Sequence, residues 1–212
     1  TADLFGASVA LSGDSLVIGA PGHDSASAQN VGAVYFFQRL GQSWTQTTDF
    51  LGASTGAGLG SDVDIFGADA IVGAPGANTV YFYAYNGATW SQSPSITGSG
   101  TLAGQFGAAV AMDQTSAVVG APTGNTGTGA AAVYVKSGST WTQQGTTFVA
   151  SLTAAESLAT GVTVSTGDRY GNAVDISGDR IAIGAPESAS GKGLVYTYER
   201  TGTTWGHKQA FA

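Results

Sequence analysis

The composition and charge of this 212-residue chain favour a turn-rich β-protein and exclude several classes of partner. Charged residues make up only 10% of the chain and 33 residues are Gly, which is typical of strands joined by tight turns rather than of a helical bundle. The formal charge is -7 with only seven basic residues, too few for binding nucleic acid or an anionic lipid surface. Because the chain has no Cys, disulfides, thiolate metal sites and Cys nucleophiles are excluded.

The sequence predicts no membrane-spanning segment. No apolar run approaches the roughly 18 residues that a spanning helix needs. The first residues, from Thr1 to Leu4, show no basic stretch followed by an apolar run, so no signal peptide is expected among them. Scarce Lys together with abundant Gly, Ser and Thr suits a secreted protein, and we expect an extracellular or cell-surface location.

A repeated pattern divides the chain into four units. In each unit a Gly that follows Phe, Leu or Tyr lies 13 residues before the Gly of a Gly-Ala-Pro triplet. A Val-Tyr pair comes next, and then one of the four Trp residues of the chain: Trp44, Trp90, Trp141 and Trp205. Landmarks that recur in the same order predict four copies of one supersecondary unit.

The first unit predicts four strands in chain order, A to D: residues 7–11, 16–18, 34–37 and a strand that starts at Trp44. A tight turn joins A to B, as expected for a hairpin. Pro94 falls in the second copy of strand D, and Pro cannot donate a ladder hydrogen bond. Strand D is therefore expected at the outer edge of each sheet and strand A innermost.

Strand B is apolar on both sides in every unit, at residues 16–18, 70–72, 117–119 and 181–183. Such a strand must be covered on both faces, which places it inside a stack of sheets. We predict an all-β, β-propeller-like fold with four blades of four antiparallel strands each. The blades are expected at 1–52, 53–99, 100–152 and 168–212, with a connection at 153–167, all in a single domain spanning 1–212.

These motifs resemble a known repeat family. The Phe-Gly at 5–6, the Gly-Ala-Pro at 19–21 and the Val-Tyr-aromatic strand at 34–37 are similar to the FG-GAP repeat of integrin α-type β-propellers and of many bacterial surface proteins. The resemblance implies a propeller, an extracellular setting and a role in adhesion or recognition. Four blades are fewer than is common in that family, so a four-bladed ring and a partial propeller are both open.

Many FG-GAP repeats hold Ca²⁺ in an Asp-rich loop between strands A and B, but here each such turn has a single carboxylate. One carboxylate per turn does not supply the six or more oxygens that Ca²⁺ needs. Asp62, Asp64 and Asp175 on strand A are weak candidates for attracting a cation, and more often such residues are solvated walls of a channel. We expect no metal and no cofactor.

No catalytic motif stands out in the sequence. The two His residues, His23 and His207, are expected in a loop and on an edge strand, and no nucleophile elbow, zinc motif or phosphate loop is present. Two carboxylates converging from different blades, as in a glycoside hydrolase or a lyase, remain an alternative. We expect a protein that is not an enzyme.

The loops from B to C vary in length, whereas the A-to-B turns are constant. Variable loops on a rigid scaffold are where binding specificity usually resides, so we predict a ligand face formed by the B-to-C loops and the D-to-A connections. The long connection 145–167 contains Thr153-Ala154-Ala155-Glu156, which predicts a helix-capping box, with an added strand at 161–164 as the alternative. The candidate ligand-binding residues are His23, Asp24, Asn30, Asn78, Asn125, Glu187 and Lys192.

Two functions follow as hypotheses. The first is a non-catalytic extracellular adhesion or recognition module that binds a protein or a carbohydrate ligand through this loop face. The alternative is a structural subunit of a surface assembly or filament, which self-associates through blade faces and exposed edge strands.

Overall fold

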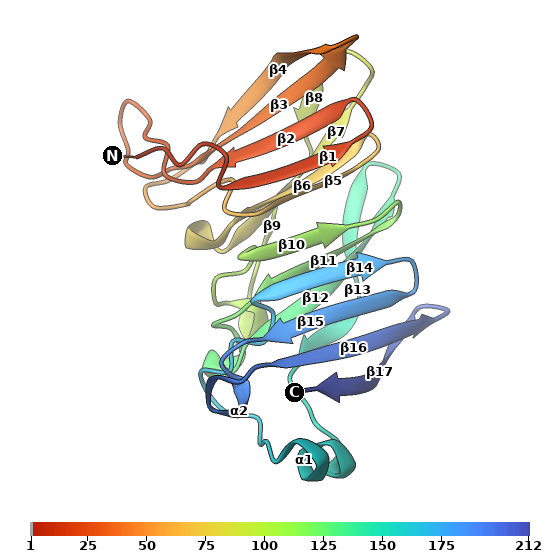
Figure 1. The fold of residues 1–212 in the computed structure, drawn as a ribbon. Coiled ribbons are helices and arrows are strands. Elements are labelled where there is room, and N and C mark those ends of the chain that lie inside the picture. Colours follow the sequence, from red (N-terminus) through yellow and green to blue (C-terminus); the bar gives the residue numbers. More distant parts are fainter. Residues whose placement is uncertain (1) are drawn as a thin grey trace.

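The computed structural model describes residues 2–212, apart from the side chains of Leu158 and Thr160, and is built almost entirely of strands. Four antiparallel sheets follow one another along the chain, confirming the predicted all-β, four-bladed architecture (Figure 1). In each blade the strands lie side by side in chain order. Blades 1 and 2 comprise β1 Ser8–Ser12, β2 Ser15–Ala20, β3 Ala33–Leu40, β4 Ser43–Leu51, β5 Val63–Phe66, β6 Asp69–Ala74, β7 Thr79–Tyr85, β8 Trp90–Gln92 and β9 Ile96–Thr97. Blades 3 and 4 comprise β10 Ala109–Met112, β11 Ser116–Ala121, β12 Ala130–Ser137, β13 Thr140–Val149, β14 Ala173–Ser177, β15 Arg180–Ala185, β16 Leu194–Thr201 and β17 Thr204–Phe211.

The helical segments are short and lie in the connections between strands. Two are assigned as helices, α1 Ala154–Thr160 and α2 Ser188–Gly191, and three are 3₁₀ turns, η1 Pro75–Ala77, η2 Gly100–Leu102 and η3 Asn125–Gly127. Helix α1 begins with the predicted capping box, because the Thr153 hydroxyl accepts from the Glu156 N–H while the Glu156 carboxylate accepts from the Thr153 N–H. The alternative of a strand at 161–164 is wrong.

The outer strand of blade 2 is broken into β8 and β9, which both pair with β7. Pro94 lies in the break between them. Since Pro has no N–H for the ladder, its place in the outermost strand agrees with the predicted order from A inside to D outside.

The four blades form an open arc rather than a ring. The innermost strands β1, β5, β10 and β14 pack against one another in succession, and Figure 1 shows blades 1 and 4 at opposite ends of the stack. Of the two arrangements left open by the sequence, the closed four-bladed ring is wrong and the partial propeller is confirmed.

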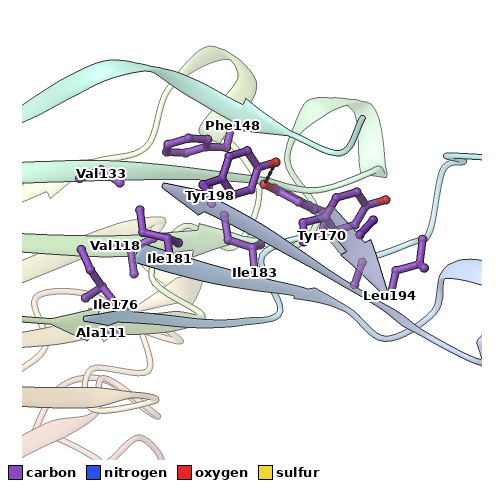
Figure 2. Close-up of a cluster of buried hydrophobic side chains, with 14 of the residues drawn as sticks. Ala111, Val118, Val133, Phe148, Tyr170, Ile176, Ile181, Ile183, Leu194 and Tyr198 are labelled. Carbon is purple, nitrogen blue, oxygen red and sulfur yellow. Dashed lines mark hydrogen bonds between the residues drawn. The ribbon is translucent and has the colours of Figure 1, made fainter. Parts of the chain in front are cut away.

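Each blade has a leading face, directed toward the preceding blade, and a trailing face, directed toward the following one. Apolar cores fill the three junctions between these faces. Figure 2 shows the core between blades 3 and 4, where Val118 and Val133 of blade 3 meet Ile181, Ile183 and Tyr198 of blade 4. Burying side chains of this size stabilises each junction by about 1.5–3 kcal/mol per residue.

Burial of strand B depends on the position of its blade. Every residue of β11 in blade 3 is buried, and only the first residue of β6 in blade 2 is not. In the end blades, β2 and β15 alternate between buried and partly open residues. The prediction that strand B is covered on both faces is therefore correct for blades 2 and 3 and wrong for blades 1 and 4, because the end blades have one neighbour each.

The Gly-Ala-Pro glycine permits close approach of consecutive blades. A Cβ on Gly120 would overlap the carbonyl oxygen of Gly171, the Gly that follows Tyr170 at the start of blade 4. The same overlap would occur at the other two junctions, between Gly19 and Gly60 and between Gly73 and Gly107. The Gly-Ala-Pro glycine of one blade and the first Gly of the next blade are thus the two sides of one backbone contact. Each inner blade therefore uses its two glycines in two contacts, one with each neighbour.

In blades 2, 3 and 4 the Trp of strand D packs onto the preceding blade. Trp90 of blade 2 stacks on Phe36 of blade 1 with ring centroids 4.5 Å apart, and Trp141 of blade 3 stacks on Phe82 of blade 2 at the same distance. Trp44 has no preceding blade and is 39% exposed. Stacking of this kind adds about 0.5–1.5 kcal/mol beyond the area that it buries.

Candidate ligand-binding face

The B-to-C loops and the D-to-A connections emerge together along one side of the stack, with helix α2 among them (Figure 1). The candidate residues predicted from the sequence all lie in these B-to-C loops, distributed over the four blades. The structure therefore places them on one face without gathering them into one cluster.

The loop of blade 1 holds three of the candidates. His23 Nδ1 lies 3.2 Å from a carboxylate oxygen of Asp3, and Asp24 accepts the N–H of Asn30 at 2.7 Å. Asn30 has a φ of 50°, a left-handed conformation that Asn tolerates better than most residues. Asp24 and Asn30 are brought together as two sides of one loop, and their bond fixes the shape of that loop.

Asn78 bonds within the scaffold. Its side-chain amide donates to the Gly98 carbonyl at 2.6 Å, and its carbonyl oxygen accepts the N–H groups of Gly104 and Phe106. These bonds fasten the connection between blades 2 and 3 to the loop of blade 2. The sequence marked Asn78 as a loop residue but gave no signal of this role, because its partners lie more than 19 residues away.

Asn125 also bonds locally, donating from its side chain to the Thr128 hydroxyl at 2.7 Å. It has a φ of 47°, as the first residue of the η3 turn. Asn125 therefore shapes the loop of blade 3.

The loop of blade 4 contains Glu187 and Lys192, both exposed. Between them, Ala189 and Ser190 both adopt left-handed backbone conformations, with φ values of 59° and 58°. Neither residue is Gly, so each costs of order 1–3 kcal/mol of backbone strain. Strain of this kind concentrates at functional sites. The loop of blade 3 has a similar pair in Asn125 and Thr126, so the blade 4 loop is distinguished by strained backbone that lies next to an exposed Lys.

A hollow of about 580 Å³ opens beside this strained loop. Ala189, Ser190 and Lys192 form one wall, and Val162, Thr163 and Ser165 from the connection between blades 3 and 4 form the other. Hydroxyl groups and one ammonium group line a cavity within the size range of small-ligand sites.

Helix α1 is anchored beside this hollow by contacts that the sequence did not predict. Glu156 accepts the N–H of Ala210 on strand β17 at 2.6 Å, and one of its oxygens lies 3.6 Å from His207 Nε2. His207 also packs 5.4 Å from the ring of Tyr198. The capping-box bonds lower the pKa of Glu156, with the Ala210 bond and His207 acting in the same direction. His207 therefore participates in anchoring the connection, a role that needed the fold to become visible.

Asp168 is a second residue of this region that the sequence analysis missed. It is almost fully buried and accepts hydrogen bonds from both the N–H and the hydroxyl of Ser165. Its backbone carbonyl accepts the N–H of Glu187. Asp168 thus joins the two walls of the hollow.

The weak cation candidates of strand A bond to protein backbone. Asp62 accepts the N–H groups of Val63 and Val110, and Asp64 accepts those of Ile65 and Met112, so each carboxylate links its own strand to the next blade. Burial raises the pKa of both carboxyl groups, and these bonds only partly oppose it.

Asp175 accepts the N–H of Ile176 in the same manner, on the open trailing face of blade 4. Among the residues whose side chains the structure describes, no group of three or more His, Cys, Asp or Glu residues is arranged to hold a metal ion.

The geometry defines a β-propeller-like repeat protein with a loop-built face. Residues 1–37, 90–135 and 146–198 match the FG-GAP repeat family, which is more than half of the chain. The chain belongs to the FG-GAP repeat family, and this membership suggests a propeller-type binding module.

A solved structure shares the fold. It is described as a putative 6-phosphogluconolactonase from Bacteroides uniformis and superposes with a TM-score of 0.61 at 11% identity. The superposition covers 94% of this chain but only 52% of that one, so the four blades correspond to about half of the larger chain. At this identity the likeness shows the fold alone. No curated protein matches the chain.

In the part of the chain that the structure describes, none of the helices has the length and apolar character needed to cross a bilayer.

Proposed function

We propose that this chain is a non-catalytic recognition module that acts outside the cell and binds a protein or a carbohydrate through the loop face. Two features support the proposal: membership in the FG-GAP repeat family and variable loops held on a rigid stack of sheets. The observation that carries it is the strained pair Ala189–Ser190 beside Lys192 at the hollow of blade 4. Strained backbone, an exposed cation and hydroxyl groups together form a polar site suited to a glycan hydroxyl or carboxylate, or to a polar protein loop.

The proposal is tested by measuring binding to a printed glycan array and to immobilised matrix proteins. The variant Lys192→Ala is expected to weaken binding to the best probe by at least about tenfold, which corresponds to about 1.4 kcal/mol. Lys208→Ala is the control, because it removes the same charge from the same blade at an exposed position on strand β17, outside the hollow. Both variants are compared as monomers, because Lys208 lies on the trailing face of blade 4. Equal losses for the two variants would contradict the placement of the site.

The non-catalytic part of the proposal has its own test. Incubation with a panel of polysaccharides across several pH values is expected to give no new reducing ends and no unsaturated products. Turnover of any of these substrates would favour the hydrolase or lyase alternative.

A further inference from the structure

The two ends of the arc expose faces that are buried at every other junction. On the leading face of blade 1, Val9 and Leu11 are each 63% exposed. By strand register their counterparts in blade 3 are Val110 and Met112, which are buried against blade 2. On the trailing face of blade 4, Val195 and Phe211 are 43% and 48% exposed. Exposed apolar surface arranged in this way marks an interaction surface.

The Gly-Ala-Pro glycine of blade 4 lacks its partner within this chain. At the three inner junctions this glycine lies against the first Gly of the following blade, so closely that no Cβ would fit. Gly184 has the same position in its blade, but a Cβ there would meet nothing nearer than the Cβ of Ala173, at 3.5 Å. Gly6 of blade 1 has a φ of 89°, close to the 91° of Gly107, yet nothing lies within 4 Å of its Cβ direction. Each end of the arc thus carries one half of the backbone contact.

Polar groups at the two ends are complementary in the same register. Asp64 of blade 2 accepts the N–H of Met112 of blade 3, and Asp175 of blade 4 corresponds to Asp64. The counterpart of Met112 in blade 1 is Leu11. Joining the trailing face of blade 4 to a leading face of blade 1 therefore places the Leu11 N–H opposite the Asp175 carboxylate.

A second polar contact repeats in the A-to-B turns. The Ser12 hydroxyl of blade 1 accepts the N–H of Gly67 of blade 2, and Asp113 of blade 3 accepts that of Gly178 of blade 4, both at 3.0 Å. The corresponding residues at the open ends are Ser177 as acceptor and Gly13 as donor.

The shapes of the two end faces also differ in a complementary way. On the trailing face of blade 4, Ala182 and Thr197 occupy the positions of Ile71 and Phe82, and a hollow of about 470 Å³ lies there. The leading face of blade 1 carries large side chains, among them the exposed Trp44. Trp44 occupies the same position in blade 1 as Trp141 does in blade 3, where Trp141 stacks on Phe82 of the preceding blade.

We propose that these two faces bind each other between two copies of this chain, head to tail. The trailing face of blade 4 of one copy packs against the leading face of blade 1 of the other, repeating the inner junctions. This chain corresponds to about half the length of a larger solved chain of the same fold. Two copies that make the contact twice, each through both of its end faces, form a closed ring. This inference does not depend on the identity of the ligand at the loop face.

The tests begin with the mass of the protein in solution, measured by size exclusion with light scattering over a concentration series. The expected result is a concentration-dependent dimer. Gly184→Ala is expected to raise the dimer dissociation constant by at least about tenfold, because its Cβ fits the isolated chain but not the junction. Gly206→Ala is the matched control, because a Cβ there would meet nothing nearer than 3.9 Å. The residue that corresponds to Gly206 in blade 1 is Thr45, which stays exposed although blade 2 packs on blade 1, so position 206 is expected to stay outside the contact.

A mixing experiment tests the head-to-tail geometry. Leu11→Lys alters only the leading face of blade 1, and Gly184→Ala only the trailing face of blade 4. Each variant alone is expected to remain monomeric where the wild type dimerises, whereas their mixture restores a one-to-one dimer through the single intact pair of faces. Folding of each variant is verified by a urea midpoint no lower than that of the wild type at a concentration where the wild type is also monomeric.

A third variant is expected to act in the opposite direction. At the junction of blades 2 and 3, Asp69 bonds Lys136 with 2.6 Å between Nζ and Oδ1. At the proposed contact the corresponding residues are Arg180 and Arg39, which carry like charges, with Arg39 paired to Asp14 of its own blade. Arg180→Asp is therefore expected to tighten the dimer severalfold, with the largest gain at low salt.

Three results would overturn the proposal: a monomer at every concentration, a dimer unaffected by Gly184→Ala, or a mixture of the two variants that stays monomeric. The first result is expected if further blades of a longer chain occupy the two faces. Open-ended polymers that Gly184→Ala also dissolves would overturn the closed ring of two copies.

Discussion

The junction between blades 2 and 3 and the open trailing face of blade 4 are built from the same repeat, but only the junction is covered. Phe82 is fully buried at the junction, whereas Thr197 occupies the same position on blade 4. Asp64 bonds the following blade, whereas Asp175 meets no following blade in this chain. The comparison teaches that the repeat motif fixes where a contact is made, while the side chains around it determine which partner is accepted.

The glycine of Gly-Ala-Pro gives the largest expected difference between a covered and an open face. Gly120→Ala should lower the free energy of unfolding by about 3 kcal/mol, because the new methyl group overlaps the backbone of Gly171 and separates blades 3 and 4. Gly184→Ala should leave stability unchanged or raise it by about 0.5 kcal/mol, since the methyl group fits and the unfolded chain loses entropy. Urea denaturation at a concentration where the protein is monomeric measures both. Equal destabilisation by the two variants would show that the close approach is not what requires Gly.

The carboxylates of strand A give a smaller difference. Asp64→Asn should destabilise the protein by about 1–2 kcal/mol, because an amide retains one acceptor oxygen for the two N–H groups that Asp64 accepts. Asp175→Asn should change stability by less than about 0.5 kcal/mol, because its one amide oxygen can still accept the N–H of Ile176. The same urea titration provides the measurement, and a larger loss for Asp175→Asn would reverse the comparison.

The smallest expected effect is a pH dependence of stability that comes from the partly buried carboxylates Asp62 and Asp64. Burial raises the pKa of Asp62 and Asp64 above the ordinary value of 3.8, so the folded protein binds more protons than the unfolded chain between 3.8 and the raised values. The contribution of these groups to stability therefore falls as the pH rises through that window and recovers as the pH is lowered.

The measurement compares urea unfolding of the wild type and of the double variant Asp62→Asn, Asp64→Asn at pH 4 and pH 7. Titration of the other carboxylates is common to both proteins and cancels. The stability of the wild type relative to the variant should be greater at pH 4. A greater difference at pH 7 would mean that the ionised forms are the favoured ones in the folded protein.

Much of the fold could be predicted because the motif repeats. The spacing between the two glycines of each repeat gave the number of blades, and the polar strand D with Pro94 gave the order of strands. The capping box at Thr153 and Glu156 was also readable, since all its groups lie within four residues. The loop face followed from connection lengths, but the role of Asn78 did not, because it depends on residues of the next connection.

The sequence by itself determined the strands, their order and the apolar positions, because these depend on local periodicity and on motifs of fixed spacing. Only the tertiary structure showed that the arc stays open, that Asp62 and Asp64 bind the neighbouring blade, and that strained residues border a hollow in blade 4. Curvature of the stack and contacts between blades arise from packing among residues far apart in the chain, and no local pattern encodes them.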